Sequence, residues 1–285
     1  MKSGVGVAAE SSAAGIGGPR ATTTLIFCLV VLAAVGATAL FAPLIAPSDP
    51  NAIDTFNRLL PPLTDKGHWL GTDNLGRDIF SRLIYGGRTS LVVGLIAMSF
   101  ALVFGVTLGL LAASVGGWLD DVVSWLVNVQ LSIPAIVLAI SISAVLGNGI
   151  ANVIFAIGIT LWPQFARITR GSALKVLQLP YVEGAVAIGA GRLRIALRHV
   201  LPNIASSLIV IATLELGHAI VSEAALAFLG FGVEPRRPSW GTMIADGRPY
   251  LSSAVWLTLL PSLALSLTTV AISYLGDEID PSARH

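Results

Sequence analysis

The sequence predicts an all-α membrane protein with six transmembrane helices. Hydrophobic residues make up 54% of the chain and charged residues only 12%, well below the share in soluble domains. The apolar stretches are about 20 residues long, enough to cross a bilayer as helices. They are continuous rather than alternating, which favours helices over the strands of a membrane barrel. We expect spans at 24–41, 91–115, 122–146, 150–165, 204–228 and 254–275.

The first 23 residues are rich in Gly, Ala and Ser and are expected to be a disordered N-terminus. The apolar run at 24–41 is longer than the core of a signal peptide, and further spans follow it, so we expect a retained first helix. The net charge of +1 does not indicate nucleic-acid binding. Cys28 is the single cysteine, which excludes an intrachain disulfide and a multi-cysteine metal site, and it is interpreted as a small buried hydrophobe.

Residues 42–89 form the longest segment outside the predicted spans, an arm whose first part is proline-rich and irregular. Its second part predicts a helix over 77–85 with apolar residues on one side and polar residues on the other. Asp78 and Arg82 stand four residues apart, a spacing that allows an ion pair. We interpret this helix as interfacial, lying on the membrane before the second span, with a soluble surface helix as the alternative.

Small and polar residues distinguish the second and third spans. Gly105 and Gly109 form a small-xxx-small pair that lets another helix approach closely. Asn128 and Gln130 precede Pro134 in the third span, and polar groups at this depth are costly unless they face protein or water. They indicate either a translocation pathway or hydrogen bonds between helices.

The fifth span carries three ionisable residues, Glu215, His218 and Glu223, whose spacing places them near one helical face. Ionisable groups within a span are candidates for function. A structural alternative is that Glu215 and His218 pair with each other. No further residues stand at ligand spacing, so no metal site is expected. The loop at 233–249 that follows this span is expected to be irregular.

A polar segment at 171–203 interrupts the apolar sequence between the fourth and fifth spans and predicts a water-exposed helical hairpin. Leu179 and Pro180 end one helix and allow a second to begin at Tyr181. Gly189 suits a turn that requires positive φ. A third helix at 192–200 is predicted to be amphipathic, with Leu193, Ala196, Leu197 and Val200 as its apolar face, and Pro202 is expected to end it.

These residues resemble a known family. The hairpin contains a pattern similar to the EAA motif of ABC importer permeases: Glu183-Gly184-Ala185, followed by Gly189 and by His199-Val200-Leu201-Pro202. Further blocks resemble the C-type permeases of dipeptide, oligopeptide and nickel importers: GTDNLGRDIFSRLIYGGRTSL, WPQFARITR, RHVLPN and EAALAFLGFGVEPRRPSWGTM. The resemblance covers about 71–275. Gly184 stands where the motif usually has Ala, and His199 where a general motif has Ile.

The resemblance implies a type I ABC importer permease with its permease domain at 90–275 and a cytoplasmic tail at 276–285. The hairpin would be the coupling helix, which sits in a groove of a cytoplasmic ATPase subunit. The residues that match this role are Tyr181, Glu183, Gly184, Ala185, Gly189, Arg192, Leu201 and Pro202. Such a permease has no catalytic residues and no cofactor of its own, because ATP and Mg²⁺ are bound by the partner ATPases.

The same resemblance implies a multi-pass protein of the plasma or inner membrane with both termini in the cytoplasm. Lys and Arg counts in the loops are nearly equal on the two sides and do not decide the orientation alone. The implied partners are a homologous second permease, two ATPase subunits or one fused ATPase, and an external substrate-binding protein. Di- and oligopeptides are the expected cargo, with nickel or glutathione as alternatives.

Two other functions are weighed on the residues alone. An ion-coupled secondary transporter would use Glu215, His218 and Glu223, but no internal repeat of the kind found in such proteins is present. A membrane enzyme would need a nucleophile, a base and an orienting group, and no such set accompanies His218.

Overall fold

The computed structural model describes residues 19–234 and 236–279, and these residues form helices and loops without a β-strand. Five helices within these residues are long and apolar enough to cross a membrane: α1 (Pro19–Leu40), α3 (Ile79–Val115), α6 (Ile150–Leu177), α9 (Leu201–Phe228) and α11 (Trp256–Ile279). A bent pair, α4 (Gly117–Leu131) and α5 (Ala135–Leu146), makes a sixth crossing if it is counted as one span. The six expected spans therefore correspond to these elements.

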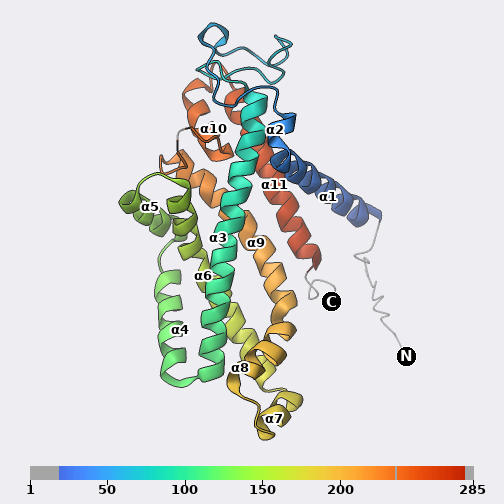
Figure 1. The fold of residues 1–285 in the computed structure, drawn as a ribbon, viewed down its shortest axis with the longest axis vertical. Coiled ribbons are helices and arrows are strands. Elements are labelled where there is room, and N and C mark those ends of the chain that lie inside the picture. Colours follow the sequence, from blue (N-terminus) through green and yellow to red (C-terminus); the bar gives the residue numbers. More distant parts are fainter. Residues whose placement is uncertain (1–18, 235, 280–285) are drawn as a thin grey trace, which may run out of the picture.

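Helices α3, α6 and α9 run between two ends of the molecule, while α11 lies beside α9 and α1 slants away from the bundle (Figure 1). One end, here the arm end, holds α2 (Ala42–Ile45), the arm at 46–78 with its short turn η1 (Thr55–Asn57), α10 (Trp240–Gly247) and η3 (Arg248–Tyr250). The opposite end, here the hairpin end, holds α7 (Pro180–Ala187), α8 (Arg192–Ile195) and a π-helical turn η2 (Ala196–Val200).

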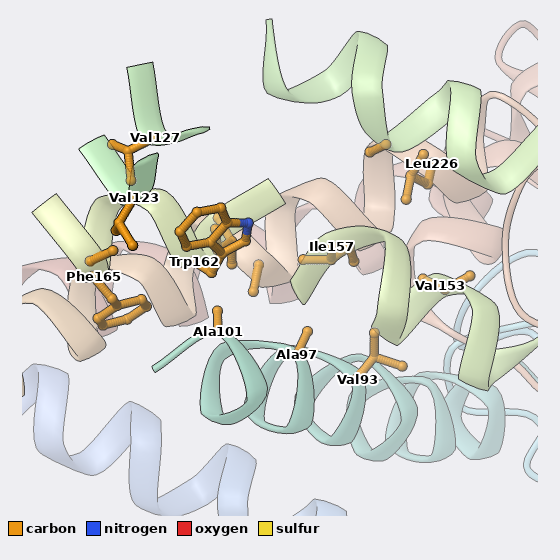
Figure 2. Close-up of a cluster of buried hydrophobic side chains, with 14 of the residues drawn as sticks. Val93, Ala97, Ala101, Val123, Val127, Val153, Ile157, Trp162, Phe165 and Leu226 are labelled. Atoms are coloured by element: carbon orange, nitrogen blue, oxygen red, sulfur yellow. The ribbon is translucent and has the colours of Figure 1, made fainter. Parts of the chain in front are cut away.

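Helices α3 and α6 form the centre of the core. An added Cβ at Gly105 would lie 2.5 Å from the Trp162 carbonyl oxygen, and one at Gly109 would lie 2.6 Å from that of Ala166. The prediction that this glycine pair allows close helix approach is therefore confirmed. Apolar side chains fill the rest of the contact (Figure 2), among them Val93, Ala97, Ala101, Ile157, Trp162 and Phe165.

The expected separate interfacial helix at 77–85 is wrong. Asp78 caps α3, since its carboxylate accepts a hydrogen bond from Ser81 N at 2.8 Å, and the helix then continues without a break into the membrane span. Ile79 is buried as expected, but Arg82 on the predicted polar side is buried too. The arm and α10 cover this segment from several sides, which removes the two-faced environment that an interfacial helix needs.

The expected third span is bent by 90° between α4 and α5. Pro134 begins the second half, and because proline has no amide hydrogen it does not continue the helical hydrogen-bond ladder of the first half. The fourth span is longer than expected, because α6 continues through Pro163 to Leu177 and takes in the first residues of the segment 171–203.

The loop at 233–249 was expected to be irregular but contains α10. Ser239 starts this helix with a capping box, in which its side chain accepts from Thr242 N and the Thr242 hydroxyl accepts from Ser239 N. The predicted disordered N-terminus and the C-terminal tail lie mostly outside the described residues, although 19–23 belong to α1 and 276–279 to α11.

Candidate functional site: the hairpin and the polar groups of the spans

The hairpin at the end of α6 is a short helix, a glycine turn and a return into α9. Pro180 occupies the first turn of α7, where its missing amide hydrogen costs no helical hydrogen bond. Gly189 has φ +86°, a left-handed conformation that glycine adopts without strain. Its amide donates to the Val186 carbonyl at 2.9 Å, and that of Ala190 donates to Ala185 at 3.0 Å, so the turn closes the helix end.

The hairpin is fixed to the membrane helices by a small apolar cluster. Val182 of α7 is fully buried and belongs to one cluster with Ile195, Val200 and Leu110 of α3. A polar contact adds to this anchor, because Asn203 Nδ2 of α9 donates to the Tyr181 hydroxyl at 2.8 Å. The predicted residues Tyr181 and Leu201 therefore lie where the hairpin meets α9.

The opposite surface of the hairpin is free of neighbours within the described chain. Glu183 is exposed, and an added Cβ at Gly184 would meet nothing within 4 Å. Ile188 is 87% exposed and Leu193 is 72% exposed. Ala185 is half-buried, whereas Arg192 and Pro202 are exposed. An acidic group beside small and apolar residues thus forms an open surface, which we call the hairpin surface (183–193).

The predicted apolar face of 192–200 is only half right. Ala196 and Val200 are buried, but Leu193 and Leu197 are exposed and Ile195 is buried instead. The π-helical turn explains the difference, because its wider pitch brings residues five apart, such as 195 and 200, onto one face. Pro202 does not end a helix as predicted, since it lies in the first turn of α9 and the chain continues helically.

The three ionisable residues of α9 separate into a pair and a single group. Glu215 Oε2 lies 3.3 Å from His218 Nδ1, the contact given by the structural alternative. The His218 side chain is 71% exposed, whereas Glu215 is largely buried. Glu223 is fully buried and accepts a hydrogen bond from Ser90 Oγ of α3 at 2.9 Å. The three residues therefore do not form one cluster.

The polar residues of α4 also separate. Gln130 donates from its side-chain amide to the Ile159 carbonyl of α6, a hydrogen bond between helices. Asn128 is exposed. The interhelical interpretation thus describes Gln130, while Asn128 faces away from the packed core.

Charged contacts at the arm end were not predicted. Arg82 is 3% exposed at its side chain and lies 3.6 Å from Asp73 and 3.4 Å from Asp246, and Arg77 Nε lies 2.6 Å from Asp73. The predicted pair of Asp78 with Arg82 is therefore wrong, because Asp78 instead contacts His68 at 3.1 Å. Partial burial raises the pKa of Asp246 above its ordinary value, and the nearby arginines oppose this shift.

Two further interhelical contacts were also missed. Arg170 of α6 forms a two-pronged ion pair with Asp120 at the start of α4, with Nη2 to Oδ2 at 2.6 Å. Ser90 Oγ accepts from Trp240 N at 3.2 Å, which joins the Glu223 contact to α10. The signal available in the sequence was a charged or polar residue within an apolar run, but its partner lay 50 or more positions away.

Comparisons with known proteins agree with this architecture. The model of the family described as "Binding-protein-dependent transport system inner membrane component" matches residues 105–285. The N-terminal transmembrane domain of oligopeptide transport permease C matches residues 23–62. A crystal structure of the MetNI methionine ABC transporter in an inward-facing conformation has the same fold, with a TM-score of 0.58 over 73% of this chain and 98% of that chain at 21% identity.

Curated relatives match over most of their length. The dipeptide transport system permease protein DppC of Alkalihalophilus pseudofirmus is 40% identical over 87% of this chain and 81% of its own. The probable D,D-dipeptide permease DdpC of Escherichia coli K12 is 38% identical over 94% of this chain and 89% of its own. The glutathione permease GsiD of Pectobacterium atrosepticum is 39% identical over 88% of this chain and 82% of its own. The chain therefore belongs to the binding-protein-dependent inner membrane components, the multi-pass permeases of ABC importers.

Proposed function

We propose that this chain forms half of the translocation pathway of an ATP-driven importer for di- or oligopeptides. The hairpin surface (183–193) carries the proposal, because it is anchored on one side and open on the other. A surface of this kind fits the groove of a partner protein, since its small residues let the partner approach the backbone closely. The dipeptide and glutathione permeases among the relatives support a peptide cargo.

The proposed orientation puts the hairpin and both termini in the cytoplasm and the arm end outside. The hairpin would then contact a cytoplasmic ATPase subunit, and the arm end would receive an external substrate-binding protein. A homologous permease would complete the pathway, with two ATPase subunits or one fused ATPase below it. ATP and Mg²⁺ would be bound and used by those subunits, so this chain would act without a cofactor and without catalysis.

Individual hairpin residues take different parts in this proposal. Glu183 is exposed and suits a polar contact with the ATPase. Gly184 and Ala185 keep the contact close, and Gly189 sets the direction of the turn. Arg192 lies beyond the turn on the open side. Tyr181 would hold the hairpin against α9 through Asn203, Leu201 would pack against the apolar cluster of Val182, and Pro202 would start α9 beside them.

Two polar groups of the spans are proposed to face the pathway. Asn128 and His218 are exposed on membrane helices, where a polar group is costly against lipid and favourable against water. The buried Glu215 would orient the His218 ring through their contact of 3.3 Å. An ion-coupled transporter would use the same pair, so the test must separate the two energy sources.

The test is uptake into proteoliposomes by the complete purified complex. We expect peptide uptake to require ATP and the added binding protein, and a proton gradient alone to drive none. Gly189→Leu should lower the coupling of ATP hydrolysis to uptake, since leucine disfavours positive φ by about 1–2 kcal/mol. Gly171→Leu is the matched control, because Gly171 lies in α6 outside the hairpin surface and its added Cβ would meet open space. Uptake driven by protons alone, or unchanged coupling in Gly189→Leu, would contradict the proposal.

A further inference from the structure

A cavity of about 780 Å³ at the arm end is not used by the proposed function. It is lined by the segment after α2, by one face of α3 and by the loop between α9 and α10. The residues that matter for its chemistry are Asp49, Tyr85, Arg88, Val92, Arg236 and Arg237. This volume is in the range of sites that hold small molecules or large headgroups.

The charge in this cavity is not balanced. Arg88 and Arg236 make no hydrogen bond or ion pair with any residue in the described ranges 19–234 and 236–279. Arg237 has one distant partner, Glu234, at 3.8 Å. Asp49 is the one acidic side chain among the residues that line the cavity. The cavity therefore has an excess of positive charge and suits an anion.

The cavity lies at the boundary between the membrane and water. The apolar run of α3 begins at Leu91, so Arg88 stands about one helical turn beyond it. The apolar window of α1 ends at Leu40, and α2 follows directly with Leu44 83% exposed. Pro43, at the edge of the cavity, therefore lies at the level where lipid headgroups meet water.

An exposed apolar strip continues from the cavity into the membrane on the same face of α3. The strip consists of residues separated by seven, four and seven positions, which share one helical face: Tyr85, Val92, Ile96 and Val103. Val92, Ile96 and Val103 are exposed, the last by 67%. A cationic cavity at the headgroup level above an apolar strip matches a molecule with a charged head and long chains. Arginine binds phosphate with two parallel hydrogen bonds, which makes it well suited to such a head.

We propose that this cavity binds the phosphate of an anionic phospholipid from the leaflet on the arm side, with its acyl chains along the α3 strip. Free phosphate shares the head chemistry, but it would not use the strip. A carboxylate from an external protein would use the charge alone. The proposal does not depend on the cargo of the importer.

The test uses native mass spectrometry of the complete purified complex in detergent, titrated with phosphatidylglycerol or phosphatidylcholine. The double variant Arg88→Gln with Arg236→Gln should weaken phosphatidylglycerol binding at one site about tenfold and leave phosphatidylcholine binding unchanged. Lys66→Gln is the matched control, because Lys66 is exposed on the same arm but does not line the cavity. Arg88→Lys should retain part of the affinity, since it keeps the charge but loses the two-pronged geometry.

Competition identifies the source of the phosphate. Inorganic phosphate and glycerol 3-phosphate should displace phosphatidylglycerol only at concentrations at least a hundredfold higher. Equal potency of these small anions would overturn a lipid site. Equal phosphatidylglycerol binding by the wild type and the double variant would overturn the proposal, as would an equal loss in Lys66→Gln. If the double variant instead lowered only the affinity for the substrate-binding protein, the cavity would be a protein contact.

Discussion

The two ends of the molecule each have an apolar cluster but differ in how many buried polar bonds join their elements. At the arm end, α3, α10 and the arm are joined by buried charges and hydrogen bonds, centred on Arg82 and on Ser90 with Glu223. At the hairpin end, α7 is held by Val182 in an apolar cluster and by the hydrogen bond of Asn203 to Tyr181. Several buried directional bonds fix one geometry at the arm end, whereas a small apolar contact with one exposed hydrogen bond would let the hairpin move as a unit. The comparison indicates a stiff arm end and a hairpin that can transmit force.

The largest expected effect is the loss of the buried cation. Arg82→Ala would remove the 3.4 Å contact with Asp246, which keeps Arg77 at 3.7 Å, and would empty a buried position between Asp73 and α10. The lost charged hydrogen bonds and the emptied buried position together cost about 3 kcal/mol. Thermal unfolding of the purified complex in detergent measures it, with Lys66→Ala on the same arm as the control. Equal melting temperatures for the two variants would show that the arm end does not depend on this charge.

The glycine seam between α3 and α6 connects the two ends. Gly105→Ala would place a Cβ 2.5 Å from the Trp162 carbonyl oxygen, and such overpacking costs about 1–3 kcal/mol. Gly36→Ala in α1 is the matched control, since nothing lies within 4 Å of its added Cβ and alanine favours a helix by about 1 kcal/mol. The melting temperature should therefore fall in Gly105→Ala and stay level or rise in Gly36→Ala.

A matched pair of valines in α7 separates anchoring from docking at the hairpin end. Val182→Ala removes a fully buried side chain and should cost about 1–2 kcal/mol, seen as faster proteolysis at 178–192. Val186→Ala removes an exposed side chain and should leave proteolysis unchanged while weakening ATPase binding. The opposite ranking of the two variants in proteolysis would mean that α7 docks through its other face.

An effect similar in size to that of Val182→Ala is expected at the polar link between α3, α9 and α10. Ser90→Ala removes the hydrogen bond to Glu223 and the one from Trp240 N, and each contributes about 1 kcal/mol. Ser99→Ala, on an exposed position of the same helix, is the control. Denaturant unfolding monitored by tryptophan fluorescence should separate the two variants, and no separation would mean that these two hydrogen bonds do not stabilise the contact of α10 with α3 and α9.

The sequence predicted the parts of this structure that depend on local pattern. The lengths of the apolar stretches predicted the six spans. The spacing of Gly105 and Gly109 predicted the close contact of α3 with another helix. The hairpin followed from Pro180 and Gly189, whose backbone preferences act within a few residues. The bend at Pro134 had a visible cause, but its size depends on how α5 packs against α6, which no local pattern carries.

Long-range contact partners and irregular helix geometry could not be predicted from the sequence. Arg82 stood beside Asp78 at a favourable spacing, yet its partner Asp246 is 164 residues away, and only the packing of α10 brings them together. The exposed positions of Leu193 and Leu197 were missed for another reason. Periodicity was counted at 3.6 residues per turn, and the π-helical turn at 196–200 shifts the register.

Helix α3 has a mechanical consequence for the whole molecule. Its 37 residues form one unbroken helix about 55 Å long, which exceeds the hydrocarbon thickness of a bilayer. It carries Arg82 near one end and, near the other, Leu110, which belongs to the apolar cluster of Val182. Because no break interrupts this helix, a tilt about a point within the membrane would move its two ends in opposite directions.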